Sequence, residues 1–240
     1  MIRAAIAILT LPLLLPLQSY GRQAETGGKA PSFNGVWRAV PEKDAPREGT
    51  TLRWIPRPDQ IPAFTPEYAA RFKKIQASRE TGSEETEPVT RCLPPGMPYF
   101  MGAEYGLEVV QAPDKIAFFS EWMDAYRRVY LDGRKPPKDF DPSYNGFSTG
   151  HWEGDTLVIE TTNLRDDTVL DKFGSPHSDA TRIVERLRMT APDLFEDKVT
   201  VYDSKAFTKP WEYVQAFRRA KPGDDMLREN TCTESLKLAK

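Results

Sequence analysis

The sequence predicts a mainly β protein: an antiparallel up-and-down meander closed into a lipocalin-like barrel, with one short N-terminal helix. From Leu107 onward, apolar and polar residues alternate with a period of two, which is typical of half-buried strands. These runs are rich in β-branched and aromatic residues, and no segment of helical period separates them, so hairpins should join them into an antiparallel sheet. A meander of eight or more strands leaves no edge exposed only if the sheet closes.

The first thirty residues predict export. Arg3 supplies a positive charge, and the apolar run 4–17 is 14 residues long, shorter than the ~20 residues that a spanning helix needs. A polar stretch with Ala24 follows, which is typical of a secretory signal peptide over 1–24; an apolar helix of the mature protein is the alternative. We therefore expect a flexible leader at 25–32, a single barrel domain at 33–240, a periplasmic or secreted location and no membrane span.

Three elements are expected before the strand-rich region. Residues 33–38 form a first strand, and 51–55 a short second one. Thr65 suits the N-cap of a helix and Pro66 its first position, because proline has no N–H to leave unpaired there. The apolar spacing that follows predicts a helix over 66–77.

The remaining strands are separated by connections of two kinds. Tight turns alternate with the long connections 132–146, 163–180 and 204–210, and successive connections of a meander lie at opposite ends. The long connections should therefore gather at one end and form the mouth of the barrel, where barrels bind ligands. The expected strands are 107–111, 115–122, 126–131, 147–152, 155–162, 181–189, 194–203, 211–219 and 225–232.

The sequence contains two cysteines, Cys92 and Cys232. An oxidising compartment favours a disulfide between them, and the alternative is two unrelated buried thiols. A structural zinc site needs four ligands, and there is no Cys-x-x-Cys and no third histidine to supply them. We expect no metal and no cofactor.

Charge and motifs exclude several classes of function. The formal net charge is −2 with 28% charged residues, so no basic face is available for nucleic acid. The chain also lacks the Gly-x-Ser-x-Gly turn of hydrolases, a phosphate-binding loop and the Gly-x-Gly-x-x-Gly of dinucleotide folds.

Two parts of the chain resemble known families. Gly35-Val36-Trp37 is similar to the Gly-x-Trp of the lipocalin-like (calycin) barrels, which implies a tryptophan that plugs the closed end. Residues 88–234 resemble a large, uncharacterised family of exported bacterial proteins, and this resemblance implies export and fold but no activity. The specific part is the Trp152-Glu153-Gly154-Asp155-Thr156-Leu157 run within Tyr144 to Thr162. The other matching segments are Cys92 to Pro98, Tyr130 to Arg134, Pro176-His177-Ser178, Val184-Glu185-Arg186 and Thr208-Lys209-Pro210-Trp211. The chain departs from that family at Lys135, Phe147 and His151.

The two histidines are expected at opposite ends of the barrel. His177 lies in the long connection 163–180, at the mouth, where an imidazole could act as a general acid or base near neutral pH. The alternative for His177 is a hydrogen bond that holds a turn. His151 precedes the tight turn at Gly154 and belongs at the closed end, so the two cannot share one site.

Three charged residues have apolar neighbours two positions away, which predicts that they point into the barrel: Glu121, Arg127 and Glu185. A buried carboxylate without a partner has a raised pKa, as a proton-transferring acid requires. The favoured alternative for Glu121 and Arg127 is that they pair across the turn at 123–124 and plug the closed end. For Glu185 both roles stay open, and Arg186 should then point outward.

These observations lead to three hypotheses on function. The first is a binding protein for a small apolar or aromatic molecule, with Tyr144, Trp211, Arg134, Arg127, Glu121 and His151 as candidate ligand-binding residues. The second is a cofactor-independent lyase, isomerase or hydrolase that transfers protons through His177 or Glu185, with Tyr144 orienting the substrate. The third is a cell-envelope interaction module that uses an apolar patch on the outer wall.

Overall fold

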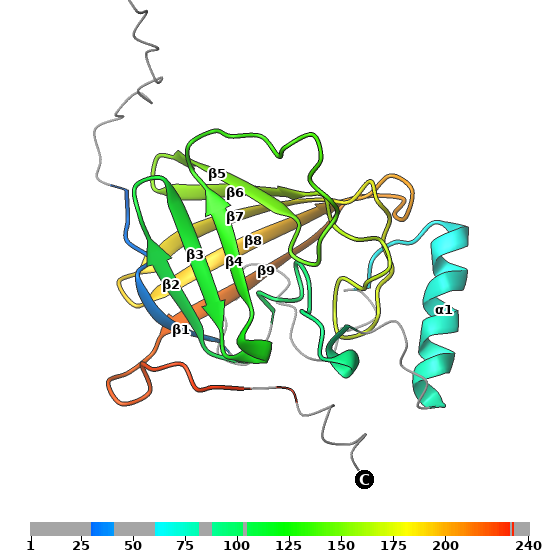
Figure 1. The fold of residues 1–240 in the computed structure, drawn as a ribbon, viewed down its shortest axis with the longest axis horizontal. Helices are drawn as coiled ribbons and strands as arrows, with labels where there is room; N and C mark the ends of the chain where they lie inside the picture. Colours follow the sequence, from blue (N-terminus) through cyan, green and yellow to red (C-terminus); the bar gives the residue numbers. More distant parts are fainter. Residues whose placement is uncertain (1–29, 41–60, 82–87, 103–104, 231, 233–240) are drawn as a thin grey trace, which may run out of the picture.

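The computed structural model describes residues 30–40, 61–81, 88–102, 105–230 and 232, and it shows a closed nine-stranded barrel with one α-helix (Figure 1). This confirms the predicted fold class. The strands are β1 Gly35–Ala39, β2 Leu107–Gln111, β3 Lys115–Ser120, β4 Tyr126–Tyr130, β5 Phe147–Glu153, β6 Thr156–Thr162, β7 Arg182–Ala191, β8 Leu194–Tyr202 and β9 Trp211–Arg219. The helix α1 is Pro66–Glu80, and two short 3-10 helices are η2 Pro88–Arg91 and η3 Trp122–Asp124.

Each strand pairs with the next one in the chain, and β1 closes the barrel by pairing with both β2 and β9. All pairs are antiparallel except one: β4 and β5 are parallel. The prediction of a fully antiparallel meander was therefore wrong at this pair. The physical reason is the length of the connection 131–146, which is long enough to run back along the barrel before β5 begins.

The parallel pair changes which connections share an end. The loops 163–181 and 203–210 lie at one end, called here the loop end, and the hairpin turns 112–114, 154–155 and 192–193 lie at the other, the turn end. The turn at 123–124 lies at the loop end and not, as we predicted, at the closed end. The connection after β4 starts at the turn end and returns to the loop end.

Aromatic side chains close the turn end. Trp37 is fully buried, and its indole Nε1 donates a hydrogen bond of 2.8 Å to the Phe33 carbonyl oxygen. Its ring packs edge-on against Phe195 with centroids 4.7 Å apart, and the Arg219 guanidinium lies 4.3 Å from the Trp37 centroid. This is the structural position that the Gly-x-Trp resemblance implied.

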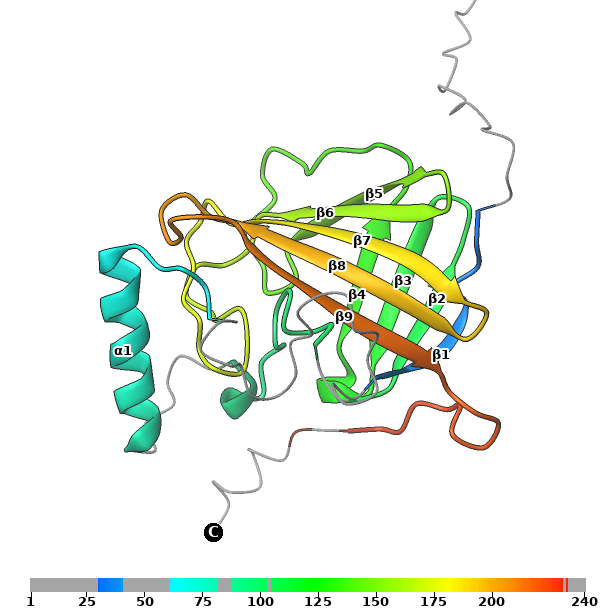
Figure 2. The same cartoon turned by 180° about the vertical axis from the view of Figure 1, so that it is seen from behind.

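Helix α1 lies beyond the loop end, beside the loop 163–181 (Figures 1 and 2). It runs three residues further than predicted, and Gln76 Nε2 donates a hydrogen bond to the Phe173 carbonyl oxygen. Gly174 has φ +81°, and a Cβ there would lie 2.6 Å from the Ile75 side chain. The close approach of helix and loop thus requires glycine at this position.

The predicted last strand at 225–232 was wrong. Residues 225–230 form no strand, and the Arg228 and Asn230 backbone N–H groups donate to the carboxylates of Glu121 and Asp124. Because β1 already occupies the edge of β9, no edge remains there for another strand. The signal peptide 1–24 and the strand 51–55 lie outside the described residues.

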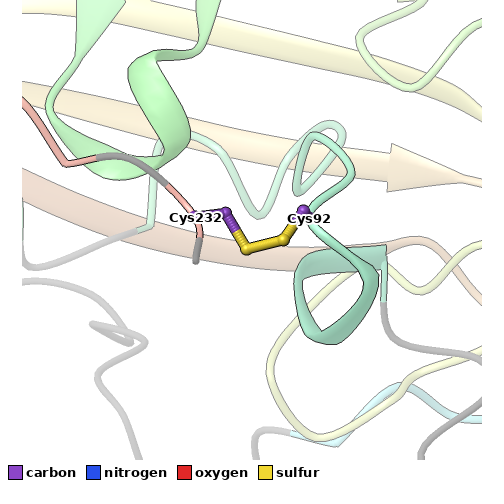
Figure 3. Close-up of a disulfide and its surroundings, with 2 residues drawn as sticks. All are labelled: Cys92 and Cys232. Atoms are coloured by element: carbon purple, nitrogen blue, oxygen red, sulfur yellow. A yellow bond between two sulfur atoms is a disulfide. The ribbon is translucent and has the colours of Figure 1, made fainter. Parts of the chain in front are cut away.

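A disulfide joins Cys92 and Cys232, whose Cα atoms are 5.5 Å apart across 140 residues of sequence (Figure 3). This confirms the predicted pairing. It ties the segment after η2 to the C-terminal segment. Within the described ranges, no helix has both the length and the apolar character to cross a membrane.

Candidate functional site

The barrel wall opens between β4 and β5. These strands share two register pairs, Val129 with Ser148 and Tyr130 with Thr149, whereas β5 and β6 share seven. Towards the loop end, β4 and the chain leading into β5 diverge, and a pocket of about 440 Å³ lies between them. This volume is within the range of pockets that hold small molecules.

Five of the residues that line the pocket are aromatic. Phe147 stacks on Tyr130 with centroids 5.3 Å apart, and Phe140 packs edge-on against Phe147 at the same centroid distance. Tyr126 and Tyr144 also line the pocket. At the loop end, Asn145 Nδ2 donates a hydrogen bond of 2.9 Å to the Tyr126 carbonyl oxygen and so bridges the gap.

Two buried polar residues, Arg127 and Ser148, also line the pocket and are called here its floor. The Arg127 guanidinium is almost completely buried and forms a two-pronged ion pair with Glu185 of β7, with Nη1 2.9 Å from Oε1. Its Nε donates to Ser148 Oγ at 3.1 Å and its Nη2 to Thr161 Oγ1 at 2.8 Å. Arg127 therefore joins β4 to β5, β6 and β7 at the place where the wall is open.

A second carboxyl group lies near this ion pair. Burial, followed by the negative charge of Glu185, raises the pKa of Asp197 well above its usual value. Asp197 Oδ2 accepts a hydrogen bond of 2.9 Å from Gln215 Nε2, and Oδ1 has no hydrogen-bond partner among the described residues. Burial favours the neutral acid at Asp197, so Glu185 alone balances the charge of Arg127.

The structure places Arg127 and Glu185 inside the barrel, as predicted, and Arg186 outside, where it pairs with Glu153. The predicted pair of Glu121 with Arg127 was wrong. Phe119, the apolar neighbour two positions before Glu121, lies on the outer face of β3, so the alternation of faces does not place Glu121 inside the barrel, and the strand itself ends at Ser120.

Glu121 instead forms an ion pair of 2.8 Å with Arg38 Nη1. Burial raises the pKa of Glu121, but hydrogen bonds from the Gly106 and Arg228 backbone N–H groups, followed by the interaction with Arg38, lower it by more. Glu121 thus lines a smaller pocket with Asp124 and Arg228, and it does not line the β4–β5 pocket.

His177 is fully buried within the loop 163–181, and it is not among the residues that line the β4–β5 pocket. Its ring nitrogens lie 2.9 Å from Thr168 Oγ1 and 3.0 Å from Thr181 Oγ1. Burial lowers the pKa of His177 to about 4, so the imidazole is neutral at neutral pH. This geometry is that of a histidine that holds a turn; a catalytic role for it stays a prediction.

The other predicted binding residues are dispersed. Tyr144 lines the β4–β5 pocket, and Arg165 lies 5.1 Å from its ring centroid. Arg134 is exposed and pairs with Asp132, and His151 is on the outer face of β5 with Nε2 3.1 Å from Glu153. Trp211 is buried against Tyr213. Of the predicted set, the pocket brings together only Tyr144 and Arg127, with Glu185 behind Arg127.

Sequence reasoning missed Ser148, Thr161 and Asp197. Asp197 stands between Phe195 and Val199, which is the same alternation that identified Glu185, so this signal was present. Ser148 and Thr161 are small polar residues that also occur on outer faces, and only the strand register shows that they meet. In the part of the chain that the structure describes, no group of three or more histidine, cysteine, aspartate or glutamate side chains is arranged to hold a metal ion.

Comparisons with known proteins give no family. No protein-family model matches the chain, and no curated protein matches it. Two solved structures that are similar to it are crystal structures of mutants of the fluorescent protein UnaG, with 15% and 16% sequence identity and TM-scores of 0.36. The alignments cover 79% and 78% of this chain and 96% of each UnaG chain. At these values the likeness gives no information on function, and the barrel is established by the strand pairing of this chain itself.

Proposed function

We propose that this protein binds a small aromatic molecule in the β4–β5 pocket. The observation that carries the proposal is the combination of aromatic walls with a polar floor. The rings of Tyr130, Phe140 and Phe147 are already packed at 5.3 Å, a spacing that is typical of favourable aromatic pairs. A planar ligand would extend this arrangement of rings.

The polar floor supports a rigid site. Arg127 is held by Glu185, Ser148 and Thr161 at once, so its position is set before any ligand arrives. Preorganised polar groups raise affinity because little conformational entropy is lost on binding. We also infer that the protein acts outside the cytoplasm. The Cys92–Cys232 disulfide supports this, because such bonds persist in oxidising compartments.

A matched pair of phenylalanine variants tests the binding proposal. Phe140 lines the β4–β5 pocket, whereas Phe119 lies on the outer face of β3, is 40% exposed and lines the smaller pocket beside Glu121 instead. The full protein is titrated with the fluorescent aromatic N-phenyl-1-naphthylamine. We expect one saturable site whose affinity falls about tenfold or more in Phe140→Ala, from the lost apolar contact, and stays within about twofold in Phe119→Ala. Absence of a saturable site, or equal effects of the two variants, would refute the proposal.

A further inference from the structure

The hydroxyl groups of Ser148, which lines the pocket, and of Thr161, which lies behind it, have one proton that no described residue accepts. Ser148 Oγ and Thr161 Oγ1 are 2.8 Å apart, and one of them donates to the other. Each oxygen also accepts a hydrogen bond from Arg127, from Nε and Nη2 respectively. Because an arginine N–H only donates, Arg127 accepts neither hydroxyl proton. One of the two hydroxyl protons is therefore used in the hydrogen bond between Ser148 and Thr161, and the other has no acceptor among the described residues.

The position of the second proton decides what the pocket recognises. Thr161 is fully buried on β6, and the partners of its hydroxyl are Arg127 and Ser148. If Ser148 donated to Thr161, the Thr161 proton would have no acceptor among the described residues. Ser148 is on β5 and lines the pocket, where a ligand oxygen can accept. A buried donor without an acceptor is costly, so the favoured arrangement has Thr161 donating to Ser148 and Ser148 donating into the pocket.

We infer that Ser148 is the polar anchor of the site and donates its hydroxyl proton to an oxygen acceptor at the end of an aromatic ligand. The inference rests on the proposed binding function. The ligand acceptor is a neutral carbonyl oxygen, as in an aryl ketone, because Glu185 already neutralises the charge of Arg127. A carboxylate beside Ser148 would add a second negative charge near Glu185 and lose its hydration, and Arg128, which also lines the pocket, is on the opposite face of β4 from Arg127.

Two ligands of the same shape isolate this hydrogen bond. 2-Acetylnaphthalene carries a carbonyl oxygen where 2-isopropenylnaphthalene carries a methylene group, and both can be measured by equilibrium dialysis with ultraviolet detection. The full protein should bind the ketone more tightly by a factor of about three to ten, the range expected for one net hydrogen bond. 2-Naphthoate should bind no more tightly than the ketone.

Two variants assign the donor to one hydroxyl. Ser148→Ala should reduce the ketone preference to about one, while Thr161→Val should keep it, because Ser148 retains its own proton and its contact with Arg127. The two substitutions each remove one hydroxyl from the same cluster. A general loss of structure around Arg127 would therefore change the ketone preference of both variants equally.

The outcomes separate this inference from the proposed function. If neither naphthalene binds the full protein, the binding function itself fails. If both bind equally, or if Ser148→Ala retains the preference, or if both variants lose it, the site exists but Ser148 is not its anchor. If 2-naphthoate bound more tightly than 2-acetylnaphthalene, the inference that the ligand acceptor is a neutral carbonyl oxygen would be wrong.

Discussion

Arg127 and Glu185 lie 58 residues apart in the sequence and form a buried, two-pronged ion pair inside the barrel. They connect β4 to β7 across the interior, although these strands are not neighbours in the sheet. β4 shares only two register pairs with β5, so this ion pair supports the strand where main-chain pairing is weakest. The same guanidinium forms the floor of the candidate pocket, and stability and binding therefore depend on one side chain.

Removal of the Glu185 charge should be strongly destabilising. Glu185→Gln leaves the Arg127 charge buried without compensation, which costs about 3–5 kcal/mol in comparable pairs. Urea denaturation should show a large decrease in the midpoint. Glu153→Gln is the matched control, because Glu153 forms an exposed ion pair with Arg186 on the outer wall, and it should leave the midpoint almost unchanged. Similar midpoints for the two variants would contradict the structural role of the buried pair.

His177 should make the stability depend on pH between about 6.5 and 4. Burial lowers the pKa of His177 to about 4 in the folded protein, whereas an exposed histidine in the unfolded chain titrates near 6.5. As the pH falls through this window, the unfolded chain binds a proton that the folded protein does not, so stability falls with decreasing pH. The loss approaches about 3 kcal/mol near pH 4.

Proton NMR of the folded protein measures this pKa directly, because only two histidines are present. The His177 ring signals should stay in the neutral position down to about pH 5. His151 lies on the surface, so the variant His151→Gln removes its signals and identifies those of His177 without changing the buried ring. A His177 titration near pH 6.5 would show that the ring is not buried as described.

Two glycines with the same backbone conformation should respond differently to alanine. Gly146 and Gly154 have φ +61° and +62°, a region that costs a side chain about 1–2 kcal/mol. At Gly146 a Cβ would also lie 2.3 Å from the Thr162 carbonyl oxygen, whereas at Gly154 no atom lies within 4 Å. Gly146→Ala should therefore lower the free energy of unfolding by clearly more than Gly154→Ala, measured by urea denaturation. It should also weaken binding of N-phenyl-1-naphthylamine, because Gly146 lines the pocket. Equal losses of stability would show that the approach of Gly146 to Thr162 is not close.

The disulfide should stabilise the fold without shaping the pocket. A loop of 140 residues corresponds to about 5 kcal/mol on the chain-entropy model. Replacing both Cys92 and Cys232 by serine should lower the melting temperature and leave the affinity for N-phenyl-1-naphthylamine unchanged, because neither residue lines the β4–β5 pocket. Two reactive thiols in the unfolded, unreduced protein would contradict the bond.

Periodicity made much of the fold predictable. The alternation of apolar and polar residues determined the strands from Leu107 to Arg219 and placed Arg127 and Glu185 inside, because a strand's side chains alternate between its two faces. The same rule would have found Asp197. It gave the wrong face for Glu121, because the apolar neighbour Phe119 lies on the outer face of β3. The predicted strand at 225–232 had no partner because β1 occupies the edge of β9.

The sequence by itself thus determined which side chains point inward, and the tertiary structure decided which of them meet. The pairing of Arg127 with Glu185, rather than with nearby Glu121, depends on strand order and closure, which bring distant segments together. The pocket depends on the parallel pairing of β4 and β5, and the residues of the connection 131–146 do not reveal whether it turns back or runs the length of the barrel. Local patterns record the two faces of a strand, whereas the neighbours across an interior are set by the geometry of the whole barrel.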